Sequence, residues 1–199
     1  MNRKYDIIYL SSLRNTNVNF YIKTLQKVYY FLFFLNIEYP GFHSWFQNNV
    51  IPDLETKQKE IILIMCGEYI AGVSILKNTY DEKKICTIRV GKHFRGQGLG
   101  KKLMEISLME LNTDKPMITV SSYRYPQFQN IFNYFGFKME DISCNYYRNR
   151  NDEICFNGQL IGSKYNSNIE PFYKLLYICD HTVDYNYKII KSNTILGLT

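Results

Sequence analysis

A glycine-rich segment at residues 95–101, Arg-Gly-Gln-Gly-Leu-Gly-Lys, has the residue types and spacing of an anion-binding loop. Its three alternating glycines carry no side chains that would keep a ligand off the backbone, so successive N–H groups can converge on phosphate oxygens. A long helical pattern begins within the segment, and the unpaired amides and positive dipole end of a helix N-terminus favour a bound anion. Lys101 and Lys102 add positive charge beside the loop. The segment therefore predicts a phosphate-binding site.

Two common phosphate-binding motifs do not fit this spacing. A P-loop requires glycine where the chain has Arg95, and Ser or Thr where it has Lys102, so the P-loop is excluded. A dinucleotide fingerprint requires Gly-x-Gly-x-x-Gly in an opening βαβ unit, whereas these glycines alternate deep in the chain. The dinucleotide site is therefore disfavoured.

The spacing that remains is Arg-x-x-Gly-x-Gly after a strand, with Arg95, Gly98 and Gly100 at its fixed positions and Val90 ending the strand. A second motif, Asn-Tyr-Phe-Gly-Phe at residues 133–137, ends a helix downstream. With these two motifs in this order, the chain resembles the GNAT superfamily of N-acetyltransferases over roughly its middle half.

The resemblance implies a fold of the α/β (α+β) class, in which a mixed, mostly antiparallel central sheet carries helices on both faces. We expect this domain to span residues 1–158. A C-terminal extension over residues 159–199 is expected to pack on the domain, form a homodimer contact or cover the acceptor cleft.

The same resemblance implies acetyl-CoA as the acetyl donor, with no metal. The backbone at Ile88 and Val90 would pair with the pantetheine arm like an added strand, and the amides of residues 96–101 would hold the pyrophosphate. The implied activity is direct transfer of an acetyl group to a primary amine in a ternary complex, with a protein, a small molecule or aminoacyl-tRNA as acceptor. The expected cofactor-binding residues are Ile88, Arg89, Val90, Arg95, Gly96, Gln97, Gly98, Leu99, Gly100 and Lys101.

The resemblance does not assign the general acid and base, because Phe132 stands where many GNAT members carry a proton-donating tyrosine. The candidates are Glu82, Tyr125 and Tyr134, with Ser121 and Ser122 as groups that orient the acceptor. Histone-type GNAT members carry a glutamate base at the position of Lys84, and Glu82 lies two residues before it on the same face of the strand. Alternatively, Glu82 is a turn residue without a catalytic role. Tyr134 is turned about 200° from residue 132 around the helix, so it does not simply replace the missing tyrosine.

The absence of that tyrosine supports an alternative, a non-catalytic acyl-CoA-binding regulatory module. A third hypothesis is an RNA-binding protein, since the formal net charge is +6. The five cysteines are widely spaced and only three histidines are present, which favours free thiols over disulfides or a zinc site. No signal peptide and no membrane-spanning run are evident, so we expect a soluble cytoplasmic protein.

Hydrophobic periodicity predicts the elements that position these residues. An amphipathic piece at residues 42–50 is expected to be broken by Pro52, and its His43, Trp45 and Phe46 either line an acceptor pocket or cover the sheet. Strands are expected at residues 5–10, 60–65, 69–76, 84–90, 117–122, 138–142, 154–157 and 183–189. Helices are expected at residues 20–35, which should be buried, and at 98–111, 126–135 and 170–179.

Two finer predictions concern the neighbourhood of the loop. Strict alternation would place Ile85, Thr87 and Arg89 on one face of their strand and Cys86, Ile88 and Val90 on the other. On the exposed side of the following helix, Lys101 and Glu105 are four residues apart and are expected to pair.

Overall fold

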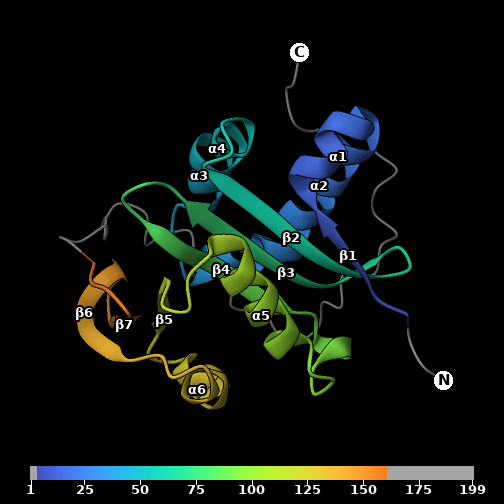
Figure 1. Cartoon of the computed structure of the whole chain (residues 1–199). Coiled ribbons are helices and arrows are strands. Elements are labelled where there is room, and N and C mark those ends of the chain that lie inside the picture. The colour runs from blue at the N-terminus through green and yellow to red at the C-terminus, as the bar shows by residue number, and fades with distance from the viewer. Residues whose placement is uncertain (1–3, 161–199) are drawn as a thin grey trace. The chain divides into compact units, whose positions relative to one another are not determined.

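The computed structural model describes residues 4–160 of the 199-residue chain. The helix and strand expected at residues 170–179 and 183–189 lie outside this range, as does nearly all of the expected C-terminal extension. The described residues form a mixed α/β structure built on one seven-stranded sheet (Figure 1). No helix in the described part is long and apolar enough to cross a membrane.

The sheet has the strand order β1-β2-β3-β4-β5-β7-β6. β4 and β5 run parallel, and every other neighbouring pair is antiparallel, which confirms the predicted mixed sheet. The strands are β1 (Asp6–Tyr9), β2 (Lys59–Cys66), β3 (Tyr69–Asn78), β4 (Lys83–Val90), β5 (Met117–Ser121), β6 (Met139–Arg148) and β7 (Asn151–Phe156).

Helices cover both faces of the sheet, as predicted (Figure 1). Alternating residues of β2 explain why: Ile61 joins a core with side chains of α1 to α4, whereas Ile62 joins a core with α5 and α6. The helices are α1 (Leu10–Thr16), α2 (Val18–Leu32), α3 (Phe42–Trp45), α4 (Ile51–Glu55), α5 (Leu99–Leu111) and α6 (Tyr125–Tyr134), with 3-10 segments η1 (Phe33–Ile37) and η3 (Lys92–Phe94) and a π-helical segment η2 (Phe46–Val50).

A glycine on β3 lets α5 lie close against the sheet. A Cβ built on Gly72 would stand 2.8 Å from Cδ1 of Leu103 and 3.3 Å from the Arg89 carbonyl oxygen, so a side chain there would force Leu103 to shift. Gly72 is also the β3 partner of Val90, the last residue of β4. The close approach therefore fixes α5 beside the end of the strand that leads into the glycine-rich loop.

A β-bulge in β4 makes the predicted alternation wrong. Ile75 of β3 pairs with Thr87 and Leu76 pairs with Ile85, so Cys86 is the extra residue. Ile85 consequently packs on the α5 face, and Cys86 packs against the core on the opposite face. Alternation is regular again beyond the bulge.

The N-terminal part contains more helix than predicted. Residues 15–19, expected to be a polar link between a strand and a helix, instead join two helices, because α1 ends at Thr16 and α2 begins at Val18. Only Asn17 lies between them, and its side chain accepts the Phe20 N–H and caps α2. The helix predicted to be buried is buried on one side only, because Phe20, Ile22 and Tyr30 are exposed. Amphipathic packing places only one side of α2 on the sheet.

The predicted helix break at Pro52 is also wrong. Pro52 lies in the first turn of α4, directly after the π-helical segment. A proline has no N–H and clashes with the carbonyl four residues earlier, and a wider turn relieves both problems. The Ile51 N–H accordingly bonds back to the Phe46 carbonyl, five residues before it.

The last hairpin is longer than predicted. The polar residues expected to link two short strands are instead the end of β6 and the start of β7, and only residues 149 and 150 turn between them. The register between these strands shifts after Ser143, and Asn145 has φ +53°. Because β6 is an edge strand with mostly exposed side chains, its sequence lacks the apolar alternation of a central strand.

Candidate functional site

β4 and β5 part after a short parallel contact. They pair at Lys84 with Met117 and at Ile85 with Ile118, and no further pair joins them. β4 continues to Val90 and β5 to Ser121, so each strand presents an open edge to the other beyond this contact.

Backbone polarity makes the open edge of β4 a place for an extended ligand. The Gly91 N–H donates to the Ala71 carbonyl on β3 at 2.9 Å, which fixes the direction of that peptide group. Because the direction alternates along a strand, the N–H and C=O groups of Ile88 and Val90 point the other way, toward β5. These groups can pair with a chain lying between the two strands.

The glycine-rich loop follows directly from this edge. Gly96 and Gly98 have φ values of +73° and +79°, a left-handed conformation that favours glycine. A Cβ built on either residue would have no neighbour within 4 Å, so both glycines border open space. Gly100 differs, because its Cβ would make ordinary contacts with Ile131 and Val90.

The loop ends at an uncapped helix N-terminus. The first intrahelical bond of α5 joins the Lys102 N–H to the Gly98 carbonyl at 3.0 Å, so the amides of residues 99–101 have no intrahelical acceptor. No side chain caps the helix at Gly98. The amides and the helix dipole thus face open space next to Gly96 and Gly98, which is the arrangement of an anion cradle.

Charged and aromatic side chains lie around this cradle. The Lys101 Nζ is 3.7 Å from the centre of the Tyr134 ring, and Glu105 pairs with Lys102 at 4.0 Å. The predicted pairing of Lys101 with Glu105 is therefore wrong. Lys101 lies over the Tyr134 ring of α6, and Glu105 pairs with Lys102 instead. On the loop itself, the Arg95 Nε donates to the Val90 carbonyl, and the Gln97 Oε1 accepts the Tyr5 hydroxyl at 2.7 Å.

Arg89 points away from the cradle. Its guanidinium carbon lies 3.6 Å from the centre of the Phe34 ring and 4.7 Å from that of Phe31, and its Nη1 donates to the Phe31 carbonyl. The side chain thus ties β4 to the segment after α2, on the face opposite α5.

The candidate acid and base residues do not gather in one place. Glu82 lies before β4, where its carboxylate pairs with Lys77 at 2.5 Å and its backbone bonds Thr79, so it stabilises the β3–β4 turn. Tyr125 opens α6 and stacks on Phe156, with ring centres 5.7 Å apart. Tyr134 is at the cradle, at the far end of α6.

Of the three residues weighed as acceptor pocket or sheet cover, Trp45 and Phe46 pack in the core, whereas His43 is exposed. Phe132 is 1% exposed and lies among three other phenylalanines, so no tyrosine hydroxyl occupies that position. Phe46 is fully buried, Trp45 packs on the same core, and the His43 Nδ1 is 2.8 Å from the Tyr29 hydroxyl.

One buried acid next to the open edge was not found from the sequence. Glu153 of β7 is 1% exposed and pairs across the sheet with Ser121, the last residue of β5. Its Oε1 accepts the Tyr39 hydroxyl at 3.3 Å, and Thr119 also bonds the carboxylate. Burial raises the pKa of Glu153 to about 7, against the opposing effect of these two hydrogen bonds and of Lys84.

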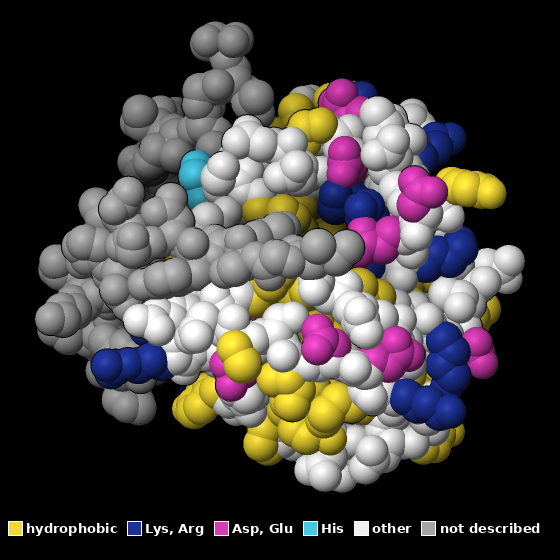
Figure 2. Space-filling model, turned by 90° about the vertical axis from the view of Figure 1, so that its left-hand side faces the viewer, with side chains coloured by type: hydrophobic (Ala, Val, Ile, Leu, Met, Phe, Trp, Pro, Cys, Tyr) yellow, Lys and Arg dark blue, Asp and Glu magenta, His cyan; other side chains and the backbone are white. Residues whose placement is uncertain are grey.

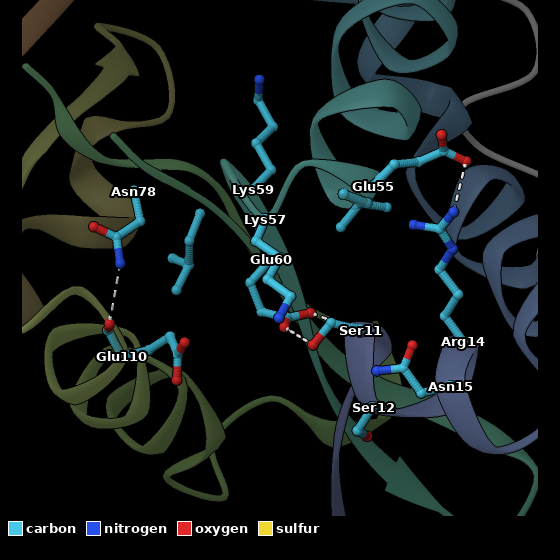
Figure 3. Close-up of a pocket in the computed structure, with 12 residues that line it drawn as sticks. Ser11, Ser12, Arg14, Asn15, Glu55, Lys57, Lys59, Glu60, Asn78 and Glu110 are labelled. Carbon is cyan, nitrogen blue, oxygen red and sulfur yellow. Dashed lines mark hydrogen bonds and ion pairs between the residues drawn. The ribbon is translucent and has the colours of Figure 1, made fainter. Parts of the chain in front are cut away.

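A separate cavity of about 300 Å³ lies at the other end of α5 (Figure 3). It is lined by Glu110 near the helix C-terminus and by Glu60, which accepts two hydrogen bonds from Ser11. α5 has 13 residues, which places this cavity about 20 Å from the glycine loop. It is therefore not part of the cradle.

Other features of the described residues bear on alternative sites. No group of three or more His, Cys, Asp and Glu side chains is arranged to hold a metal ion, and the four described cysteines are free. On the face seen in Figure 2, the described acidic and basic side chains are interspersed rather than separated by sign.

The fold and the cradle together define a mixed α/β protein that can bind an extended ligand along β4 and its anionic group at the start of α5. Residues 42–149, more than half of the chain, match the family model described as an acetyltransferase (GNAT) domain. The chain therefore belongs to the GNAT acetyltransferase family, as the two sequence motifs predicted. A comparison with curated proteins finds no match.

Several solved structures similar to this chain are described as acetyltransferases. One is a GNAT-family protein from Desulfovibrio desulfuricans, 17% identical, with a TM-score of 0.47 over 53% of this chain and 71% of that one. A Bacillus subtilis acetyltransferase in complex with CoA is 19% identical, with a TM-score of 0.45 over 55% and 82% of the two chains. The ribosomal-protein-S18-alanine N-acetyltransferase from Escherichia coli is 21% identical, with a TM-score of 0.45 over 55% and 76%.

Proposed function

We propose that this protein is an N-acetyltransferase that transfers an acetyl group from acetyl-CoA to a primary amine by direct attack in a ternary complex. One observation carries the proposal: the open edge of β4 leads directly into an uncapped, glycine-lined helix N-terminus. An extended, polar arm ending in a pyrophosphate has the shape and charge that this arrangement can bind.

In the proposed complex, the pantetheine arm bonds the outward-facing peptide groups of Ile88 and Val90. The pyrophosphate lies on the amides of residues 96–101, with Lys101 beside it. Arg89 contributes through its backbone position, because its side chain packs on Phe31 and Phe34. Arg95 contributes by holding the loop against the Val90 carbonyl.

The chemistry needs few protein groups, because a thioester is already activated. The site must hold the thioester carbonyl beside a neutral amine, accept a proton and return one to the leaving thiolate. Tyr125 stands just beyond the open edge of β5 and is our candidate for the proton donor. Glu82 is engaged in a turn and Tyr134 is at the phosphate end, so neither is assigned a proton-transfer role in this proposal.

Acetyl transfer is tested on purified full-length protein with acetyl-CoA and an acceptor panel: spermidine, a peptide with a free α-amine, a lysine-containing peptide and an aminoacyl-tRNA. Mass spectrometry detects the acetylated product, and calorimetry measures CoA binding in parallel. We expect CoA binding and transfer to one acceptor class. An absence of CoA binding would contradict the proposed cradle.

A second candidate function is a non-catalytic acyl-CoA-binding module. The observation that favours it is Phe132, which is buried where many relatives carry the proton-donating tyrosine. CoA binding without transfer to any panel member would support this function over the enzyme.

Gly98 allows a direct test of the cradle. Replacing Gly98 with alanine (Gly98→Ala) inserts a methyl group into the open space beside the free amides, so we expect CoA affinity to fall at least about tenfold, or about 1.4 kcal/mol. Gly67→Ala is a matched control, because Gly67 also has positive φ and open surroundings but lies in the β2–β3 turn. Both variants carry a similar strain of about 1–2 kcal/mol, yet only Gly98→Ala should lose affinity. Equal CoA affinities of the two variants would contradict the proposal that the pyrophosphate binds at this loop.

A further inference from the structure

A buried cluster on the face of the sheet opposite α5 surrounds the carboxylate of Glu153. Along β7, Ile154 and Phe156 pack toward α5 and α6, so Glu153 points to the other face. There it meets Tyr39, which follows η1 and is 114 residues away in the chain. Both residues lie outside the stretch matched by the family model.

The sheet register places this carboxylate beside the gap between β4 and β5. The last β4–β5 pair includes Ile118, and Ser121 lies three residues further along the open edge of β5. Ser121 is the cross-strand partner of Glu153. An amine that enters the gap from the α2 side therefore meets Glu153 on the side of the gap where β7 lies. The proposed acetyl donor, acetyl-CoA, approaches from the loop at the end of β4.

Structural stability does not explain a carboxylate at this position. None of the ion pairs among the described residues includes Glu153, and its hydrogen-bond partners Tyr39 and Thr119 are neutral. Lys84 favours the charged form of Glu153 but does not pair with it, and a buried carboxylate without an ion-pair partner costs free energy that an uncharged amide would not. Such costly, ionisable groups next to a cleft are typical of functional sites.

We propose that Glu153 is the general base of the transfer reaction and that Tyr39 is the residue that positions it. This inference rests on the proposed acetyltransferase function and adds to it the group that accepts the proton of the amine. Glu82, the base candidate from the sequence, is held by Lys77 at the far end of β4.

The proton and bond changes balance without a further reactant. The Glu153 carboxylate takes one proton from the acceptor ammonium, and the neutral amine attacks the thioester carbonyl. The C–N bond forms, the C–S bond breaks, and the thiolate receives the second nitrogen proton through Tyr125, the proposed proton donor. Glu153 returns its proton to solvent, so each turnover yields the amide, CoA thiol and one released proton.

Several charged and titratable groups face the carboxylate and set its pH range. Burial raises the pKa of Glu153 most, Lys84 on β4 lowers it, and the nearby Glu38 raises it, while Glu38 itself pairs with Arg124. Tyr147 of β6 meets Tyr39 edge to face, with ring centres 5.1 Å apart, and burial together with Glu153 raises the pKa of Tyr147. Activity should therefore rise with pH as Glu153 ionises, near pH 7.

The test compares two measurements on the full-length protein. The kcat/KM of the most active panel acceptor is measured against pH, and the Glu153 carboxyl carbon is titrated by NMR in protein with ¹³C-labelled glutamate, assigned by its loss in Glu153→Gln. We expect the rising limb of activity and the Glu153 titration to share one midpoint. Glu153→Gln should lower kcat by about 10²–10⁴-fold with unchanged CoA affinity, and exposed Glu140→Gln should change neither.

Tyr39→Phe keeps the proposal testable if Glu153→Gln folds poorly. The Tyr39 hydroxyl stabilises the charged carboxylate, so its removal should move the activity limb and the NMR midpoint to higher pH together. A Glu153→Gln enzyme with wild-type kcat, or a limb that stays in place while the NMR midpoint moves, would overturn the role of Glu153. If the wild-type protein transfers no acetyl group to any acceptor, it is the proposed function that fails.

Discussion

The burial of Glu153 predicts that the contribution of this residue to stability falls as the pH rises. The pKa of this carboxyl is raised from 4.5 to about 7, so the folded chain retains its proton over a range in which the unfolded chain has lost it. The stabilisation is fully present below pH 4.5 and is lost as the pH passes 7. A rise of this size corresponds to about 3 kcal/mol of unfolding free energy.

Glu153→Gln removes this titration while keeping the shape of the side chain. The unfolding free energy of the variant minus that of the wild type should therefore increase by about 3 kcal/mol between pH 4 and pH 8. The change of this difference with pH is the informative quantity, because altered hydrogen bonds to Tyr39 and Thr119 add an offset that does not depend on it. Other titrating groups, such as Glu110, are present in both proteins and cancel.

Urea unfolding at each pH measures the difference, with the fluorescence of Trp45, the single tryptophan, as the signal. Glu140→Gln on the exposed edge strand is the control, and its difference from wild type should stay flat. A Glu153→Gln difference that changes by less than about 1 kcal/mol over this range would refute the assignment of Glu153 as a buried group that ionises near neutrality.

Two further predictions concern residues of the cofactor-binding set. Arg89→Met should lower the unfolding free energy by about 2–4 kcal/mol, because it removes a guanidinium that stacks on Phe34 and bonds the Phe31 carbonyl. CoA affinity measured by calorimetry should stay unchanged. Reduced CoA affinity in a stably folded variant would show that the Arg89 side chain reaches the cofactor. Lys101→Met should weaken CoA binding about three- to tenfold at low salt and less at high salt. Tyr134→Leu keeps the Lys101 charge and should weaken CoA binding less. Equal effects of the two substitutions would show that the Tyr134 ring matters more for binding than the Lys101 charge.

The cradle was predictable because its information is local. The glycines at 96 and 98 are required by their own φ angles, and the helix that follows begins within the same few residues. The β2–β3–β4 meander was predictable for a similar reason, since tight turns and apolar runs identify each strand. A second local motif, the helix end at Gly136, lies in the part of the chain that the family model matches.

The bulge at Cys86 shows where local information stops. Nothing in the sequence of β4 indicates that its alternation changes, because the extra residue is defined by the pairing of β3 with β4. The error propagates directly to the site: strict alternation assigns Ile85 to the face of Arg89, whereas the bulge turns it toward α5 with Ile88 and Val90. The residues nearest the gap are therefore the hardest to orient from sequence.

Glu153 was not predicted from the sequence for the same physical reason: its burial depends on strand pairing between distant parts of the chain. It ends a stretch of polar residues that has the composition of a link, and only the long-range pairing with β5 places Glu153 in a central strand. Its hydrogen-bond partner Tyr39 comes from a turn 114 residues earlier, so no spacing rule connects the two. A ligand-binding loop for a cofactor is encoded in one short segment, whereas a base with a raised pKa requires burial, and burial is a property of the whole sheet. The proposed acetyl donor is accordingly inferred from seven consecutive residues, and the proposed proton acceptor only from the folded chain.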